Sequence, residues 1–520
     1  MGHSHPSRRE ILSRIPVLTG GSLLLPLHGQ KPDTSAPAVI RGTITDANGA
    51  GVAAKVRVVE TGTGRAWFPA DSIKTMPDRP GSAEVMRYFY AKARYEVAVP
   101  PGRYRIEVVR GIAHAPAVGF TEVGSGITHQ ENIRIAPLAG WNSEGWYSGN
   151  THTHYHLQID ENPDDRLRVV PPAEALDVSV ISYLIRNDSP YITNRYKVGR
   201  LPQFSRDGTL MDMGEEARNN HTFEGFGYGH VLFLNIPKPI EPVSTGILSA
   251  DGKTPDFPTL TMLCEQARAL GGTTVWCHNG SGIEVPVAAA LGHLDAYNVA
   301  DGLDADYARY YRLLNCGFRI PVSSGTDWWI YDHNRVYVKV EGAFTYDSWL
   351  AGLRAGRTFV TNGPLVDFAV NGQGPGTEAA VGERAQVRVK VASRLPFDRV
   401  ELIHDGEVIA EQMSIGGAVS AIEREVPFDR GGWLAARVIS SARSHGGARV
   451  FAHTSPVYCR LAGTPFRRAE AAGAFVDEIE ASLRLIRKSF RFASDADRAV
   501  ALGKFDQGRA AFLKIAGGTA

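Results

Sequence analysis

Cysteine is scarce in this sequence: its 520 residues include 4 cysteines but 16 histidines. So few thiols exclude a scaffold held together by many disulfides, and they exclude a cysteine-rich zinc module. A metal site in this chain would therefore have to take nitrogen and oxygen ligands, which histidine, aspartate and glutamate supply.

The sequence also has almost no net charge, and it has no long apolar run. Lys+Arg number 56 and Asp+Glu 55, so the formal net charge is +1. This balance argues against nucleic acid or a membrane surface as the partner, and favours a small-molecule substrate. No run of about 18 or more apolar residues occurs, so no membrane-spanning helix is expected. The length predicts about three or four domains.

The N-terminus has the pattern of an export signal. Residues 7–12 read Ser-Arg-Arg-Glu-Ile-Leu and resemble a twin-arginine signal, and a short apolar segment follows at 15–27. Pro16 and Pro26 interrupt that segment, which is too short to span a bilayer. We interpret 1–37 as signal and linker, which predicts a periplasmic or secreted protein; a soluble tail is the alternative.

Periodicity divides the rest of the chain into four parts. Segments of 38–137 alternate like short strands, and 140–364 alternates apolar strands with helical stretches, as in a parallel sheet or barrel. Strand patterns return over 365–461, and 464–520 is helical. An apolar stripe in the tail predicts a helical hairpin packed on the body rather than a dimer seam; it comprises Phe475, Ile479, Leu483, Ile486 and Phe490.

The stretch 149–156, Gly-Asn-Thr-His-Thr-His-Tyr-His, carries the clearest chemical signal. On a strand, His152 and His154 point to the same side, so two imidazoles can bind one cation. Alone, such a pair also occurs on solvated strands.

Further ligand-type residues stand at or near predicted strand ends in the same part of the chain. Glu215 and Glu216 follow Gly214, and His230 opens the strand 231–234. His278 ends the strand 273–277, and Asp327 follows the strand 318–322. Strand ends line the active sites of α/β folds, so these residues are expected to converge. Cys277 is expected to point away as a packed thiol.

This ordered set resembles the PHP superfamily (polymerase and histidinol phosphatase), and most closely the CehA/McbA family of metallohydrolases. The resemblance rests on His-x-His, Gly-x-Glu, Gly-His-Val, a strand-end histidine and Gly-Thr-Asp, and 357–364 resembles the segment that closes that family's catalytic domain. Residues 38–137 resemble the carboxypeptidase-regulatory-like β-sandwich. The implied fold is a distorted β/α barrel flanked by N- and C-terminal β-sandwich modules and followed by the helical tail.

The resemblance implies roles for individual residues. His152, His154 and Asp327 match one metal site, and Glu216 matches the bridging carboxylate, with Glu215 as the alternative. His230 and His278 match the histidines of a second metal, and with Asp327 they are the candidate catalytic residues.

Two departures remove the ligands of a third metal. The superfamily's Asp-His pair is replaced by Ile185-Arg186-Asn187-Asp188, and its final Asp-x-His reads Asp327-Trp328-Trp329. A mono- or binuclear centre of Zn, Mn or Fe is therefore expected. Asp188, His156, Asp160 or His333 could substitute, and we interpret His221 as a loop histidine.

Substrate contacts are assigned more loosely. Trp328 and Trp329 either wall the site or pack in the core, Asn279 follows the strand-end histidine, and Arg186 either binds an anionic substrate or is solvated. The leading hypothesis is an exported hydrolase of an ester, amide or carbamate bond. The alternatives are a phosphoesterase and a non-catalytic glycan- or cell-wall-binding protein with a vestigial metal site.

Overall fold

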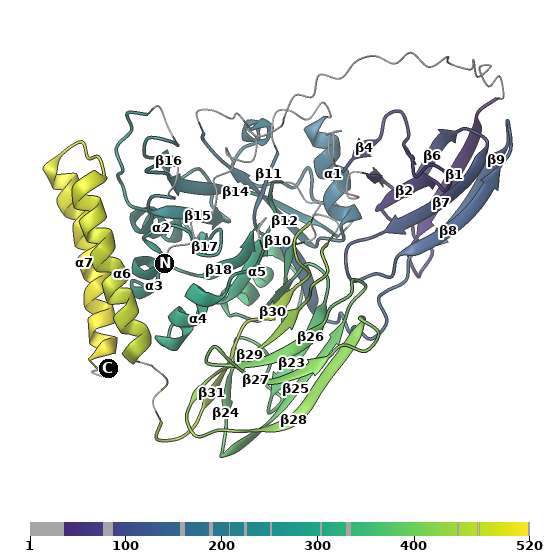
Figure 1. The fold of residues 1–520 in the computed structure, drawn as a ribbon. Coiled ribbons are helices and arrows are strands. Elements are labelled where there is room, and N and C mark those ends of the chain that lie inside the picture. The colour runs from purple at the N-terminus through teal and green to yellow at the C-terminus, as the bar shows by residue number, and fades with distance from the viewer. Residues whose placement is uncertain are drawn as a thin grey trace, which may run out of the picture.

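The computed structural model describes residues 36–75, 87–155, 162–186, 191–206, 208–222, 226–249, 252–301, 304–328, 334–444, 447–464, 466 and 469–517. The chain is a multidomain, mostly β protein built around a curled half-barrel sheet (Figure 1). The signal-like segment 1–27 lies outside the described residues, as do Trp329 and the substitute ligands Asp188, His156, Asp160 and His333.

Two sheets enclose the N-terminal core. One contains β1 (Ala38–Thr45), β6 (Arg94–Val99) and β9 (Thr128–Arg134). The other contains β2 (Ala54–Glu60), β3 (Ala66–Trp67), β4 (Ile73–Lys74), β5 (Phe89–Ala91), β7 (Gly102–Val109) and β8 (Ala117–Val123). Alternate residues of β1 and β6 are buried, as the sequence pattern predicts for strands with one face on a core.

A curled sheet forms the centre of the molecule. Its strands in spatial order are β19 (Val322–Gly325), β18 (Ala296–Asp301), β17 (Thr273–Trp276), β15 (Gly229–Leu234), β14 (Leu210–Asn219), β12 (Val178–Tyr183) and β10 (Trp146–Asn150). All neighbours are parallel except at β15, which runs antiparallel to both β14 and β17.

The two ends of this sheet meet. The short strands β11 (Thr153–His154) and β20 (Asp327–Trp328) continue from β10 and β19 and pair in parallel. Gly325 allows this approach, because a Cβ there would lie 2.4 Å from the Cβ of His152. Residues from both edge strands of the curled sheet therefore lie at the same rim.

The elements outside the curl are short. They are β13 (Gly199–Arg200), β16 (Ser244–Thr245), the 3₁₀ turn Ile192–Arg195, α1 (Pro163–Ala173), α2 (Leu260–Ala269), α3 (Val285–Ala290), α4 (Ala308–Asn315) and α5 (Tyr346–Arg354). β14 and β15 are buried along nearly their whole length, as expected where helices and other strands cover both faces of a sheet.

The strand predicted at 318–322 is misplaced. The structure forms β19 from 322 to 325, where Val322 pairs with Tyr297 of β18. The Ser324 hydroxyl donates to the carbonyl of Ala300 and the Ser323 hydroxyl lies 3.3 Å from that of Thr151, so both serines are accommodated in the core. The apolar pattern therefore predicted a strand at 318–322, just before β19, because the two serines of β19 interrupt that pattern.

The C-terminal strands share the central sheet. β21 (Arg335–Lys339) pairs with β10, and the sheet continues through β22 (Thr358–Thr361), β30 (Ala452–Thr454), β29 (Gly432–Ile439), β26 (Arg399–His404) and β27 (Glu407–Met413). β31 (Val457–Arg460) also pairs with β29, and β24 (Glu378–Ala380) pairs with β31. A second sheet of β23 (Leu365–Val370), β25 (Arg384–Ala392) and β28 (Val419–Pro427) contributes to the same core. Asp405 and Gly406, both at positive φ, form the turn that joins β26 to β27.

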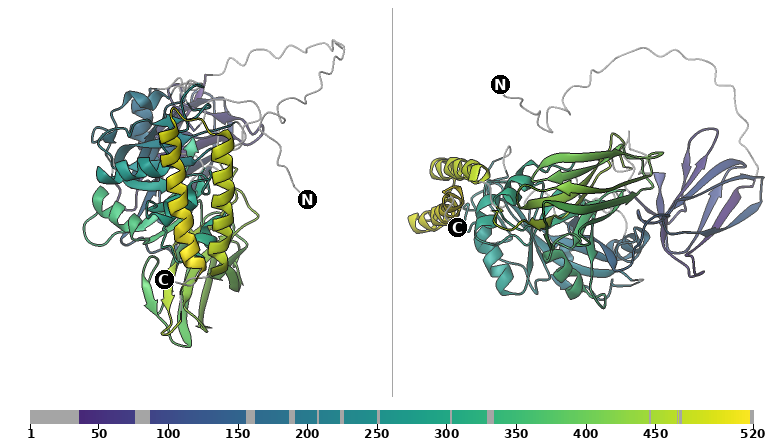
Figure 2. Two further views of the ribbon diagram at one scale, coloured as in Figure 1. Left: turned by 90° about the vertical axis from the view of Figure 1, so that its left-hand side faces the viewer. Right: turned by 90° about the horizontal axis from the view of Figure 1, so that it is seen from below.

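The tail forms a helical hairpin of α6 (Ala469–Ser489) and α7 (Asp495–Ala516), packed on the central part (Figure 2). The predicted stripe from Phe475 to Phe490 is buried, which confirms the packed hairpin. At its turn, the Arg491 amide donates to Oδ2 of the buried Asp256 at 2.9 Å. Within the described residues, no helix is long and apolar enough to cross a membrane.

Candidate metal centre

One rim of the curled sheet collects histidines and carboxylates from almost every strand. They are His152 and His154 around β11, Glu216 in β14, His230 in β15, His278 after β17, Asp301 at the end of β18, and Asp327 in β20. His230 opens its strand, whereas the others lie near strand ends. It reaches the same rim because β15 runs antiparallel to its neighbours.

A first group of ligand atoms surrounds the two histidines of the His-x-His motif. Nε2 of His152 and Nε2 of His154 are 2.9 Å apart. Oε2 of Glu216 lies 2.9 Å from the His154 nitrogen, and Oδ1 of Asp327 lies 3.5 Å from the His152 nitrogen. The four residues thus direct two nitrogens and two carboxylate oxygens at one point.

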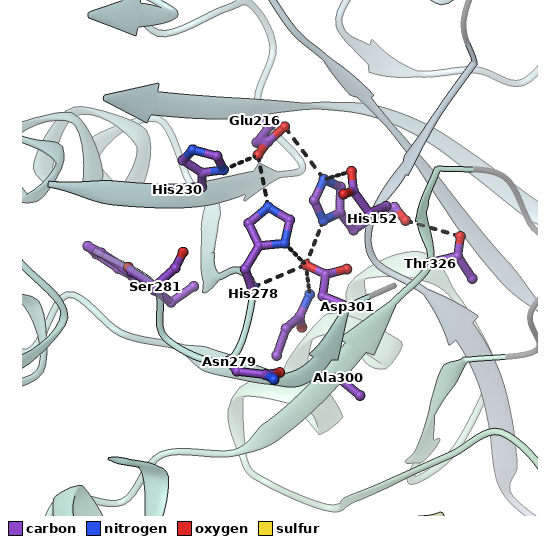
Figure 3. A network of polar contacts seen from close by, with 12 residues as sticks. His152, Glu216, His230, His278, Asn279, Ser281, Ala300, Asp301 and Thr326 are labelled. Carbon is purple, nitrogen blue, oxygen red and sulfur yellow. Dashed lines mark hydrogen bonds and ion pairs between the residues drawn. The ribbon is translucent and has the colours of Figure 1, made fainter. Parts of the chain in front are cut away.

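Glu216 connects this group to a second one. Its other oxygen, Oε1, lies 2.9 Å from Nδ1 of His230 and 3.4 Å from Nε2 of His278. Figure 3 shows the carboxylate between His230 and His152, with His278 directed towards it. One carboxylate shared by two ligand groups is an arrangement that can bridge two cations.

The outer nitrogens of the first two imidazoles are already engaged. Nδ1 of His152 lies 2.7 Å from Oδ2 of Asp301, and Nδ1 of His154 lies 3.1 Å from the carbonyl oxygen of Ser182. Both partners are acceptors, so each Nδ1 carries a proton and each Nε2 presents a lone pair. Two lone pairs 2.9 Å apart require a proton or a cation between them, so the residues fit a divalent metal.

The electrostatics of the rim keep its carboxylate bridge ionised. Burial alone would raise the pKa of Glu216, but the positive charge of Arg218 and the imidazoles around the carboxylate outweigh burial and hold that pKa well below its usual range. Burial similarly opposes charge on His152, yet Asp301, Cys277 and Asp327 raise the pKa of this imidazole well above normal. Without metal, these charges favour a proton between His152 and His154.

His230 behaves differently. Burial and the nearby Arg218 lower the pKa of His230 to about 3, so its ring is neutral. Burial lowers the pKa of His278 too, but Glu216 and Asp301 more than compensate and raise it. Burial raises the pKa of Asp327, whose side chain is the most exposed of the carboxylates in the cluster.

Left-handed backbone is concentrated at the rim. His278, Asn279 and Asp327 have φ of 51°, 55° and 58°. Such conformations are unfavourable for residues other than glycine and persist where the surrounding structure imposes them. Three such residues beside one cluster indicate that the surrounding structure holds the backbone in an unfavourable conformation in order to place these side chains.

Glu215 and Glu216 are adjacent in β14, so their side chains point to opposite faces of the sheet. Glu216 enters the cluster, whereas Glu215 lies on the other face of β14, where its Oε2 accepts from the Ile240 amide at 2.5 Å. Burial raises the pKa of Glu215 to about 8. The structure therefore does not place Glu215, the alternative ligand, among the clustered residues.

Cys277 is a buried thiol, as expected, but the expectation that it points away from the site is wrong. Its sulfur lies within 4.8 Å of ligand atoms of His152, His278 and Asp301. β17 ends at Trp276, and His278 has a left-handed φ, so the alternation of a strand does not extend to this pair. Cys277 remains fully buried, and burial raises its thiol pKa strongly.

The remaining predicted residues lie at varying distances from the cluster. Burial raises the pKa of Tyr191 to about 12, and the charge of Arg186 and its hydrogen bond to Tyr191 oppose that rise. The Tyr191 ring is 5.4 Å from that of His154. Asn279 donates to the carbonyl of Asp304 at 3.0 Å. The backbone of Trp328 pairs with His154 in β11. His221 stacks on Phe490, away from the cluster.

Sequence reasoning missed Asp301, Ser182 and Asn220. Asp301 ends an apolar strand, a position that could have marked it as a rim residue. Ser182 contributes only its backbone carbonyl, and the Asn220 side chain reaches Nε2 of His230 at 2.6 Å. Nothing in the local sequence indicates either contact.

Comparison with known proteins adds no family. No protein-family model and no curated protein matches the chain. Among solved structures, the Bacillus anthracis TIE protein is 8% identical with a TM-score of 0.14, over 83% of this chain and 51% of that one. A Bacteroides uniformis beta-glucuronidase is 10% identical with a TM-score of 0.17, over 79% and 58%. The chain thus spans about half the length of the first, and likeness this weak supports no inference.

Proposed function

We propose that this protein is an exported metal-dependent hydrolase of the PHP superfamily, similar to the CehA/McbA family, with a mono- or binuclear centre on a distorted β/α barrel. The observation that carries the proposal is the His152–His154 pair, whose Nε2 atoms face each other at 2.9 Å while Glu216 and Asp327 face the same point. The closure of the curled sheet through β11 and β20 supports the barrel.

Each residue of the rim has a distinct task in this proposal. His152, His154 and Asp327 would hold one cation, His230 and His278 would hold a second, and Glu216 would serve both. When bound, a divalent Zn, Mn or Fe ion lowers the pKa of a water molecule and polarises a carbonyl or phosphoryl oxygen. Asp301 orients His152 through Nδ1 and receives the backbone amide of His278 at 3.4 Å.

Proton transfer falls to Asp327 and His278. Asp327 has a side-chain exposure of 16%, against 2% for Glu216 and none for Asp301, so it is the carboxylate that substrate can reach. An accessible carboxylate beside the cluster can accept a proton and return it to a leaving group. His278, 9% exposed, is the more accessible histidine of the second group; His230 is 2% exposed.

The surroundings favour a small substrate with an apolar part. The Phe226 side chain is 43% exposed, and its ring lies 5.0 Å from that of His230 and 5.9 Å from that of His278. An exposed aromatic ring beside the cluster offers a surface for an apolar acyl or aryl group. We propose an ester, amide or carbamate as the bond that is cleaved.

Export is part of the same proposal. The twin-arginine-like signal at 7–12 would direct the folded, metal-loaded protein to the periplasm or the medium. Fusion of residues 1–37 to a reporter that requires this export route tests it, with Arg8→Lys/Arg9→Lys as the control that should abolish export.

The decisive experiment measures metal per chain. Purified wild type should retain one or two divalent ions and hydrolyse aryl esters, and His152→Ala and Asp327→Ala should lose both properties. His129→Ala is the matched control, because His129 lies on β9 in the N-terminal sheets and pairs with Glu131 rather than with a residue of the cluster. Cleavage of p-nitrophenyl phosphate instead of esters would make the protein a phosphoesterase, and metal-free wild type that binds glycan would overturn the hydrolase.

A further inference from the structure

The turn of the C-terminal helical hairpin meets a buried carboxylate of the central part. Asp256 is 0% exposed and lies between β16 and α2. The Arg491 amide, between α6 and α7, donates to Oδ2 of Asp256 at 2.9 Å, and the Asp256 amide donates to the Arg491 carbonyl at 2.8 Å. The Arg491 guanidinium also donates to the carbonyl of Gly252 at 2.8 Å, so the hairpin turn is fixed to this segment by both backbone and side chain.

The other oxygen of Asp256 binds Asn219, the last residue of β14. Nδ2 of Asn219 donates to Oδ1 of Asp256 at 3.2 Å and to the Thr245 hydroxyl at 2.8 Å. Oδ1 of Asn219 accepts from the Tyr228 amide at 2.9 Å. A backbone amide can only donate and a carboxylate can only accept, so these partners fix the orientation of the buried Asn219 side chain.

Asn219 is also the base of the loop that presents Phe226 to the cluster. Gly227 has a left-handed φ of 54°, and a Cβ there would lie 2.0 Å from Oδ1 of Asn219. The loop therefore passes directly against the Asn219 side chain. Phe226 comes one residue earlier, and its exposed ring lies 5.0 Å from that of His230.

Aromatic rings of the hairpin contact both arms of the same loop. The Phe490 ring stacks on that of His221 at 4.3 Å and lies 4.9 Å from that of Tyr228. Phe505 of α7 lies 5.9 Å from the Tyr228 ring, which is fully buried. The hairpin thus reaches the loop through its apolar surface as well as through Asp256.

We propose that the helical hairpin is part of the substrate site, with Asp256 as the positioning residue that links the hairpin turn to Asn219 and so to Phe226. The proposal rests on the proposed hydrolase, in which Phe226 offers a surface to the apolar part of the substrate. It gives residues 469–517 a task in substrate binding.

The body of the hairpin is held by other contacts, so a change at Asp256 does not detach it. α6 and α7 both pack against α3 (Figure 1). A Cβ on Gly508 of α7 would lie 3.1 Å from Cα of Val287 in α3, and Nζ of Lys504 lies 2.6 Å from Oε1 of Glu265 in α2.

Substrate selectivity tests the proposal. Asp256→Asn turns one acceptor oxygen into a donor, so the side chain can no longer accept from both Arg491 and Asn219. The KM for aryl esters of long apolar acids should rise about fivefold, as expected for the loss of one hydrogen bond that holds the binding surface. The KM for the corresponding acetates and the kcat for both should stay unchanged, because the cluster itself is intact.

Two further variants separate positioning from loss of stability. Asn219→Asp combined with Asp256→Asn exchanges amide and carboxylate at the same net charge, so it restores every hydrogen bond and should restore the KM. Asp295→Asn is the matched control, because Asp295 accepts from the Thr274 amide at 2.9 Å at the end of β17 that lies away from the cluster. It should leave the KM for both ester classes unchanged.

Hydrogen exchange of the Tyr228 amide is a measurement that needs neither metal nor activity. Exchange should be about fivefold faster in Asp256→Asn and return to the wild-type rate in the double variant. Phe490→Leu, which leaves the carboxylate in place, should also speed this exchange and serves if Asp256→Asn does not fold.

An equal KM change for long-chain esters and acetates, or a double variant that does not recover, overturns the proposal. If no ester is hydrolysed, the proposed function fails, and exchange of the Tyr228 amide decides whether Asp256 positions the loop. Exchange that is the same in wild type and Asp256→Asn would then refute that role.

Discussion

Glu215 and Glu216 are neighbours in sequence but occupy opposite faces of β14. Glu216 lies among three histidines within 3.4 Å of its oxygens, whereas Glu215 meets a backbone amide and apolar surroundings. One carboxylate is therefore held ionised and the other is held neutral near pH 7.

We predict opposite outcomes for replacing these two glutamates. Glu216→Gln should remove bound metal, because an amide cannot serve as an anionic bridge. Glu215→Gln should keep the metal. In the wild type, the raised pKa of Glu215 means that unfolding releases a proton between pH 4.5 and about 8. The stability of the wild type therefore falls as pH rises through this window.

Thermal unfolding followed from pH 5 to 8 checks this second effect. Glu215→Gln should flatten the pH dependence and raise the Tm at pH 8 relative to wild type. Loss of metal from Glu215→Gln, or its retention by Glu216→Gln, would contradict the assignment of the two faces.

The proton between His152 and His154 has a measurable consequence. The raised pKa of His152 keeps its ring charged at neutral pH when metal is absent, so a metal has to displace that proton. Metal affinity should therefore increase with pH up to the pKa of His152, by about tenfold per unit. Titration calorimetry in phosphate and in Tris should show release of at least one proton; heats that are independent of buffer would refute it.

At the scale of elements, the contact between β10 and β19 determines whether the rim forms. We predict that Gly325→Ala weakens metal binding and lowers stability by about 1–3 kcal/mol, because the added Cβ has to displace the strand that carries His152. Metal content and thermal unfolding measure both effects.

Gly503→Ala is the matched control for this change. Gly503 lies in α7, and a Cβ there would meet nothing within 4 Å. This substitution should raise stability by about 0.5–1 kcal/mol through helix propensity and leave the metal unchanged. Equal effects of the two substitutions would show that the close approach at Gly325 is unimportant.

At the scale of the whole molecule, a buried ion network joins the N-terminal sheets to the central part. Glu174, which caps α1, lies 2.7 Å from Nζ of Lys55 in β2 and accepts from the Tyr90 hydroxyl at 3.0 Å. Its backbone carbonyl accepts from Arg335 of β21 at 2.7 Å. Glu174 and Lys55 are 0% and 1% exposed, so their charges depend on each other.

We predict that Glu174→Gln lowers the free energy of unfolding by about 3 kcal/mol, since it leaves buried cations without their counter-charge. Glu96→Gln, which breaks the exposed Arg41–Glu96 pair, should cost less than about 1 kcal/mol. Denaturant unfolding of both variants measures the difference. Similar costs would show that the network does not hold the two parts together.

Local patterns were sufficient for much of the fold. The strand alternation within 38–137 and the helical stripe of the tail both appear in the structure, because each reflects burial within a few residues. Prediction failed at 318–322 and at Cys277, where buried serines and a left-handed residue interrupt simple periodicity.

The sequence by itself determined which residue types were available for a metal and that His152 and His154 share a strand face. Only the tertiary structure decided that Asp301, 149 positions from His152, orients its ring, that Glu216 rather than Glu215 joins the cluster, and that Asn220 touches His230. The reason is physical: alternation along a strand follows from local backbone geometry, whereas hydrogen bonds across a curled sheet depend on strand order, direction and register, which no local pattern encodes.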